Sequence, residues 1–254
     1  LTALAAELKQ NPLSDERLQA NRARTAGLAE GVAKVRGQLD ATLTNTGSPM
    51  HSSHIPTACR RFFGDDTVYV FDGGNATVWA SFYSEINRPD TLLSTFKFGM
   101  LGAGVSQALG GQIAKPDSKV VCIIGDGAMG FHVQELETAL RNELPVIYLV
   151  LCDKQWGMVK LTQTLGLQLL RPAIGSEAQG TINADFEEIA FDQVAEAMGC
   201  HGERISDPSE IEGALQRCVD SGKPSVIHVD VDQNMHLFAP GLQEFKAMHQ
   251  EPGA

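Results

Sequence analysis

Two apolar runs, each followed at once by small or acidic residues, constrain the fold of this 254-residue chain more than any other feature. The first run, residues 120–124, leads into a Gly-Asp-Gly turn at residues 125–127. The second, residues 146–151, leads within two positions to Asp153. Uninterrupted apolar runs of strand length are typical of parallel strands buried on both faces. The chain is therefore predicted to be an α/β protein, with a parallel sheet flanked by helices on both faces.

The Gly-Asp-Gly turn has the composition of an anion-binding loop. It is followed by residues 131–140, in which Val133, Leu136 and Leu140 fall on one face of a predicted helix. Glycine lets the backbone approach a ligand closely, and a helix N-terminus offers unpaired N–H groups with a partial positive charge. We therefore expect a diphosphate at this turn.

Two carboxylates are expected at the same edge of the sheet. Asp126 and Asp153 are 153 − 126 = 27 residues apart, and each follows a predicted strand. Open α/β sheets bind ligands at the carboxyl ends of their strands. Both carboxylates would repel a diphosphate unless a divalent cation lay between them, and Mg²⁺ accepts one or two carboxylates together with phosphate oxygens. The sequence therefore predicts a magnesium diphosphate site.

At these residues the chain resembles the thiamine diphosphate (ThDP) enzymes related to acetolactate synthase. That family has a Gly-Asp-Gly turn followed about one βα unit later by Asn. Residues 72–79 (DGGNATVW) resemble the family's turn beside the diphosphate, and residues 98–104 (FGMLGAG) resemble its pyrimidine-holding turn. The triplet Gly-Met-Val at residues 157–159 is also similar to that of the family. In order and spacing, the resemblance covers roughly residues 50–235.

The resemblance implies a role for each matching residue. Asp126 and Asp153 would bind Mg²⁺ through their side chains, and Gln155 through its backbone carbonyl. The residues implied to contact the cofactor are Asn75, Ala76, Gly99, Met100, Leu101, Gly125, Gly127, Ala128, Gly157 and Met158. No catalytic residue is assigned to this chain, because the family's activating Glu lies on another domain.

Two positions depart from the family pattern. Asp153 stands where most relatives have Asn, which adds a negative charge that strengthens the hold on a cation and increases repulsion of the diphosphate. Thr162 stands where acetolactate synthases tend to have Trp. The first departure makes the metal site unusual, and the second weakens the assignment to acetolactate synthesis itself.

The resemblance implies a lyase or transferase that makes or breaks a carbon–carbon bond on a 2-oxo acid, in the manner of acetolactate synthase. The alternatives are a 2-hydroxyacyl-CoA lyase, which Gly130 and Phe131 also resemble, a simple 2-oxo acid decarboxylase, or a cofactor-binding module that is inactive without a partner domain. This chain would supply the diphosphate and magnesium half. The expected partners are an N-terminal pyrimidine-binding domain, in the same chain or another, and further copies in a homodimer or tetramer.

The chain is expected to have three parts. Residues 1–49 have helical spacing and are interpreted as a linker or the end of a preceding domain. Residues 50–235 form the predicted ThDP domain, and residues 236–254 a solvated tail. Between residues 160 and 184, glycines and a proline predict a long loop that serves as a lid. We expect a C-terminal fragment or one chain of a split enzyme.

The composition of the chain limits the classes of partner and the cellular compartment that are expected. A net charge of −11 and a pI near 5.0 argue against nucleic acid as a partner, and no apolar run is long enough for a membrane span. Five scattered cysteines favour the reduced cytoplasm over a disulfide scaffold. His51, His54 and His132 lie nearest the predicted site and are interpreted as surface or hydrogen-bonding residues. His132, which follows the diphosphate turn, is the one to test.

Overall fold

A computed structural model describes residues 2–96, 98–174 and 180–241, and the side chains of residues 167–174 lie outside this description. The chain divides into two units, residues 1–44 and residues 45–254. Among the described residues, no helix combines the length and the apolar character needed to cross a membrane.

The first unit is helical, as its composition and spacing predicted. It contains α1 (Thr2–Gln10), α2 (Asp15–Asp40) and the short 3-10 helix η1 (Ala41–Thr44). Ser14 caps α2, because its side chain accepts a hydrogen bond from the backbone N–H of Arg17. None of the described residues in these three helices is buried.

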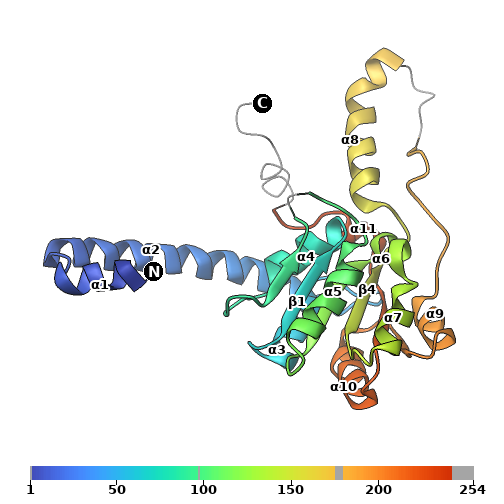
Figure 1. The fold of residues 1–254 in the computed structure, drawn as a ribbon. Helices are drawn as coiled ribbons and strands as arrows, with labels where there is room; N and C mark the ends of the chain where they lie inside the picture. Colours follow the sequence, from blue (N-terminus) through green and yellow to red (C-terminus); the bar gives the residue numbers. More distant parts are fainter. Residues whose placement is uncertain (1, 97, 175–179, 242–254) are drawn as a thin grey trace. The chain divides into compact units, whose positions relative to one another are not determined.

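The described part of the second unit is built on one six-stranded, all-parallel sheet (Figure 1). Its strands are β1 (Val68–Asp72), β2 (Leu92–Ser94), β3 (Val120–Gly125), β4 (Ile147–Cys152), β5 (His201–Ile205) and β6 (Ser225–Asp230). They lie in the order β2-β1-β3-β4-β6-β5. This confirms the prediction of a parallel sheet from the uninterrupted apolar runs.

Helices cover both faces of the sheet, because successive side chains of a strand point to opposite sides. Tyr69 and Phe71 belong to one buried cluster, and Val68 and Val70 to the other. The first cluster includes residues of α3 (His54–Phe63), α4 (Asn75–Tyr83) and α10 (Ile211–Ser221). The second includes residues of α5 (Ala103–Ala114), α6 (Asp126–His132), α7 (Glu135–Arg141) and α9 (Phe191–Ala197).

The strand order places a switch point between β1 and β3. From β1 the chain passes through α4 to β2 on one side, and from β3 it passes through α6 and α7 to β4 on the other side. These helices pack on opposite faces of the sheet. A crevice opens where the connections diverge, at the carboxyl ends of the strands, and this is the usual ligand site of such sheets.

The prediction of a long loop between residues 160 and 184 was wrong for the first part of that segment. Residues Gly157–Ile174 form α8, and residues 175–179 lie outside the described residues. Gly166 and Pro172 were interpreted as breakers. Gly166 is tolerated inside the helix, and Pro172 lies only two residues before its end.

Three further elements differ from the sequence prediction. The helix predicted over residues 131–140 is two helices, and α6 already begins at Asp126 in the Gly-Asp-Gly turn. Strand β5 was not predicted, because its HGERI sequence is polar, as suits the edge of a sheet. Helix α11 (Gln233–His236) was not predicted and ends at the first residue of the expected tail. The 3-10 helix η2 (Pro208–Glu210) precedes α10.

Candidate functional site

The carboxyl ends of three neighbouring strands meet around one cavity. Strands β1, β3 and β4 lie side by side, and the cavity at their ends has a volume of about 370 Å³. Every residue predicted from sequence to contact the cofactor or the metal lines it, namely Asn75, Ala76, Gly99, Met100, Leu101, Gly125, Asp126, Gly127, Ala128, Asp153, Gln155, Gly157 and Met158. The sheet thus gathers residues from four separate turns in one place.

Asp126 is fixed by backbone N–H groups from two strand ends. Its Oδ1 accepts a hydrogen bond from Gly127 at 2.7 Å, and its Oδ2 accepts one from the backbone of Lys154 at 2.8 Å. The second bond crosses from the turn after β3 to the turn after β4. Burial raises the pKa of Asp126, since the charged form loses its hydration.

Asp153 follows β4 directly and is 4% exposed. Its Oδ2 accepts a hydrogen bond from Nε2 of Gln155 at 3.0 Å. Burial, and after it the charge of Asp126, raises the pKa of Asp153. Among the described residues, the one ion-pair contact of either carboxylate is with His236, whose Nε2 lies 4.0 Å from Oδ2 of Asp153. Burial lowers the pKa of His236 to about 3, so this imidazole does not balance the two carboxylates.

Asn75 begins α4 and turns both polar atoms of its side chain into buried space. It is 4% exposed, and neither Oδ1 nor Nδ2 has a hydrogen-bond partner among the described residues. Buried polar atoms are nearly always paired in folded proteins. A side chain with two free polar atoms on the wall of a cavity indicates a polar ligand there.

Glycines keep the wall around Asn75 open. A Cβ atom on Gly157 would lie 2.6 Å from Nδ2 of Asn75 and 3.2 Å from Oδ2 of Asp153. A Cβ atom on Gly74 would lie 3.1 Å from Cγ of Met158. The absence of a side chain at these positions leaves the Asn75 amide and the Asp153 carboxylate next to each other.

Asp72, which the sequence analysis did not single out as a site residue, ties two of the predicted turns together. Its Oδ1 accepts a hydrogen bond from the backbone of Gly73 at 2.6 Å, and its Oδ2 accepts one from the backbone of Gly104 at 2.7 Å. Burial raises the pKa of Asp72, and the backbone N–H groups partly offset this. The signal in the sequence was an acidic residue at the end of an apolar strand, the same pattern as at Asp126 and Asp153.

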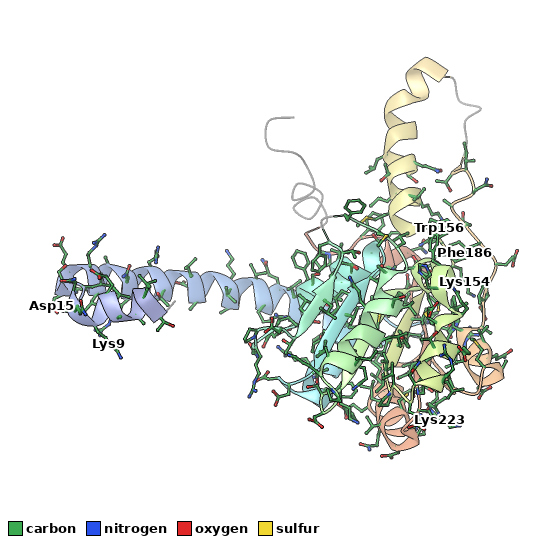
Figure 2. The ribbon with its side chains drawn as sticks, viewed as in Figure 1. Lys9, Asp15, Lys154, Trp156, Phe186 and Lys223 are labelled. Atoms are coloured by element: carbon green, nitrogen blue, oxygen red, sulfur yellow. The ribbon has the colours of Figure 1, made fainter. Side chains whose placement is uncertain are left out.

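Trp156 covers the diphosphate turn from the side of β4. A Cβ atom on Gly127 would lie 2.5 Å from the Trp156 ring, so the indole needs glycine there. The ring centroid of Trp156 is 5.4 Å from that of Phe186 and 5.9 Å from that of Phe131, and the backbone N–H of Trp156 donates to Ala184 at 2.8 Å. Figure 2 shows Trp156 and Phe186 near the base of α8. The segment after α8 therefore packs against Trp156, which itself lines the cavity.

The expectation of a solvated tail is wrong for its first residue. His236 is 3% exposed and lines the cavity. Its Nδ1 lies 2.7 Å from the hydroxyl of Ser52, and its carbonyl accepts a hydrogen bond from the indole N–H of Trp79 at 3.0 Å. These contacts pack α11 against the site. Only tertiary packing against α4 distinguishes this short polar helix from a free tail.

The three histidines nearest the predicted site make structural contacts. His51 lies 2.7 Å from the hydroxyl of Ser53, and His54 lies 2.7 Å from the backbone carbonyl of Asn45. Nδ1 of His132 is 3.1 Å from the carbonyl of Gly102, which lies within the predicted pyrimidine-holding turn. None of the three is among the residues that line the cavity.

A second group of potential metal ligands lies elsewhere, at His201, Glu203 and Cys218. Arg217 occupies both oxygens of Glu203, at 2.6 Å and 3.0 Å, and His201 lies 2.7 Å from the same carboxylate. Burial raises the pKa of Cys218 to about 12, so its thiol stays protonated. This group is a structural ion-pair cluster.

Comparison with known proteins decides the family. The C-terminal TPP-binding domain of thiamine pyrophosphate enzymes matches residues 72–229, more than half of the chain. The chain belongs to this family. Thiamine pyrophosphate is the same molecule as ThDP, and the chain contains the C-terminal ThDP-binding part of an acetolactate synthase-like enzyme.

Curated relatives carry the name of acetolactate synthase. The isozyme 2 large subunit of Escherichia coli (strain K12) is 34% identical over 168 residues, which are 66% of this chain and 29% of that protein. The large subunit IlvG of Mycobacterium tuberculosis (strain ATCC 25618 / H37Rv) is 30% identical over 213 residues, 82% of this chain and 36% of that protein. The chain thus spans about a third of the length of these relatives.

A solved structure supports the fold. The thiamine diphosphate-dependent 4-hydroxybenzoylformate decarboxylase of Rhodococcus jostii RHA1 has a TM-score of 0.60 and 21% sequence identity to the chain. The match covers 74% of this chain and 34% of that one. At this identity the similarity concerns the fold of the ThDP-binding domain.

The residues present fit the diphosphate of ThDP and a divalent cation. Asp126 and Asp153 are oxygen ligands of the kind Mg²⁺ prefers, and among the described residues no Lys or Arg side chain forms an ion pair with either of them. The unpaired amide of Asn75 offers a donor to an anion beside them. A buried charge needs an ion pair or a metal, and a cation with its diphosphate satisfies all three side chains.

Proposed function

We propose that this protein uses ThDP and Mg²⁺ to make or break a carbon–carbon bond on a 2-oxo acid, as a carboligase or decarboxylase like acetolactate synthase. The observation that carries the proposal is the pair of buried carboxylates next to an unpaired Asn75 amide, at the switch point of a sheet whose family binds ThDP. This chain supplies the half of the site that holds the diphosphate and the metal.

Each residue has a defined task in this proposal. Asp126 and Asp153 would hold the cation, and Asn75 would donate its amide hydrogens to the diphosphate. Asp72 binds the backbone N–H groups of both Gly73 and Gly104, which holds the Gly73 turn in place at the wall of the cavity. When bound, ThDP stabilises the negative charge that develops on the substrate carbon, and the protein supplies binding and orientation.

The remaining parts of the enzyme are proposed from the family. The activating Glu is assigned to a pyrimidine-binding domain that meets this one in the same chain or from another chain. The proposed assembly is a homodimer or tetramer in the cytoplasm, with a small 2-oxo acid as substrate.

Substitution of Asp126 tests the proposed function. Asp126→Ala removes a cation ligand at the edge of the sheet, so we expect metal-dependent ThDP binding to be lost while the thermal unfolding temperature stays near that of the wild type. Isothermal titration calorimetry with ThDP, with and without Mg²⁺, measures the binding. If the variant binds ThDP as the wild type does in Mg²⁺, the metal assignment is wrong.

A further inference from the structure

The side-chain amide of Gln155 is held in one orientation by three contacts. Its Nε2 donates to Oδ2 of Asp153 at 3.0 Å and to the backbone carbonyl of Gln233 at 2.9 Å. Its Oε1 accepts a hydrogen bond from Nζ of Lys160 at 2.8 Å. An amide turned over would point its oxygen at two acceptors and its NH₂ group at an ammonium. All three hydrogen bonds can form in only one orientation of the amide. The side chain is also buried, because Gln155 is 3% exposed.

Lys160 is itself fixed between two segments. It lies in the first turns of α8, and its Nζ also contacts Oδ1 of Asp185 at 2.5 Å. Asp185 forms an isolated antiparallel bridge with Gln155, so its place is set by the backbone. A continuous series of contacts thus runs from Asp185 through Lys160 and Gln155 to Asp153, and we call it the Lys160 relay.

We propose that Lys160, acting through the amide of Gln155, positions the Asp153 carboxylate for the divalent cation. This inference rests on the proposed function and adds a positioning residue to it. Without the ammonium, Oε1 of Gln155 loses its donor in a buried place, and the amide turns or shifts to find another. Asp153 then loses the contact that holds its Oδ2. A carboxylate free to turn binds a cation more weakly than one already held in place.

A simple charge effect predicts the opposite result. Lys160 is a cation close to the metal site, so its removal reduces the repulsion of a bound divalent ion. Through-space electrostatics alone would therefore make the metal bind more tightly, whereas loss of positioning makes it bind more weakly. The sign of the change separates the two explanations.

Lys154 offers a matched control. Its side chain pairs with Glu188 at 2.5 Å and takes no part in the Lys160 relay, while it lies on the same edge of the sheet. Lys154→Met removes the same charge as Lys160→Met and keeps the backbone N–H that holds Asp126. Lys160→Arg retains a donor for Gln155 and Asp185 and serves as the conservative variant.

The experiment is Mn²⁺ binding by the purified full chain in the presence of ThDP, followed by electron paramagnetic resonance of free and bound Mn²⁺. We expect Lys160→Met to weaken Mn²⁺ binding about tenfold and to broaden the spectrum of bound Mn²⁺. Lys160→Arg should restore both, and Lys154→Met should bind Mn²⁺ at least as tightly as the wild type. Thermal unfolding of each variant verifies that it is folded.

Two results overturn the inference in different ways. If the wild type binds Mn²⁺ and Lys160→Met binds it equally or more tightly, Lys160 has no positioning role and the proposed function stands. If the wild type does not bind Mn²⁺ with ThDP, or if Asp126→Ala binds it unchanged, the metal site itself is refuted, and the inference falls with it.

Discussion

A methyl group added at Gly157 tests whether Asn75 faces the cofactor. In Gly157→Ala the new Cβ atom would lie 2.6 Å from Nδ2 of Asn75, well inside the usual contact distance of about 3.5 Å. The atom it meets is the end of a side chain, so the Asn75 amide turns away while the backbone stays in place. The variant should thus disturb binding more than folding.

The substitution should change the free energy of unfolding less than it changes ThDP binding. Overpacking costs about 1–3 kcal/mol, and replacing glycine by alanine in a helix returns up to about 1 kcal/mol, so the free energy of unfolding should fall by no more than about 3 kcal/mol. A hydrogen bond to a charged group contributes about 1.5–3 kcal/mol, so the loss of the Asn75 contact should weaken ThDP binding roughly 10- to 150-fold.

Gly166→Ala is the control, because it adds the same group to the same helix, and no described atom outside the backbone of that helix lies within 4 Å of the new Cβ atom. Titration calorimetry with ThDP at saturating Mg²⁺ should give wild-type affinity for Gly166→Ala and the predicted loss for Gly157→Ala. Wild-type affinity in Gly157→Ala would refute the role assigned to Asn75. An equal loss in both variants would assign the effect to α8 itself.

Three further predictions concern packing, charge and pH. Gly104→Ala places a Cβ atom 2.5 Å from Cβ of Asp72, where nothing flexible can yield, so chemical denaturation should show a loss of about 1–3 kcal/mol, and an unchanged midpoint would contradict the packing. Asp153→Asn keeps an oxygen ligand, so native mass spectrometry should still find ThDP bound. A loss of ThDP affinity of more than about tenfold would show that the carboxylate has a role that an amide oxygen cannot fill. Burial lowers the pKa of His228 below the ordinary 6.5, so the unfolded chain takes up the proton first and the free energy of unfolding falls as the pH drops below 6.5. His228→Gln should make the free energy of unfolding depend less steeply on pH in this range. An unchanged dependence would exclude His228 as its source.

Most of the sheet was predictable, because a buried parallel strand is apolar at every position. Residues 120–124 and 146–151 read as such strands and form β3 and β4. Strand β5 was missed because an edge strand is only half-buried and can be polar, as in HGERI. Helix α8 was missed because Gly166 was interpreted as a breaker, although its cost is small inside a helix.

Some residues of the site were likewise predictable from the sequence, and others were not. Asp126 and Asp153 were predicted because each follows a buried strand, and Asn75 was implied by the resemblance of its turn to that of the family. Trp156 and His236 were not, because each reaches the cavity through contacts with residues far away in the sequence. No local pattern identifies a residue whose place depends on such distant contacts.

The sequence by itself determined the parallel sheet, the small-residue turns and the acidic residues that follow its strands, because hydrophobic periodicity and glycine content act locally. Only the tertiary structure decided which side-chain atoms remain unpaired and which groups hold the two carboxylates. The orientation of the Gln155 amide shows the reason: it is set by Asp153, Lys160 and a carbonyl 78 residues away, at Gln233, which meet only when the chain is folded.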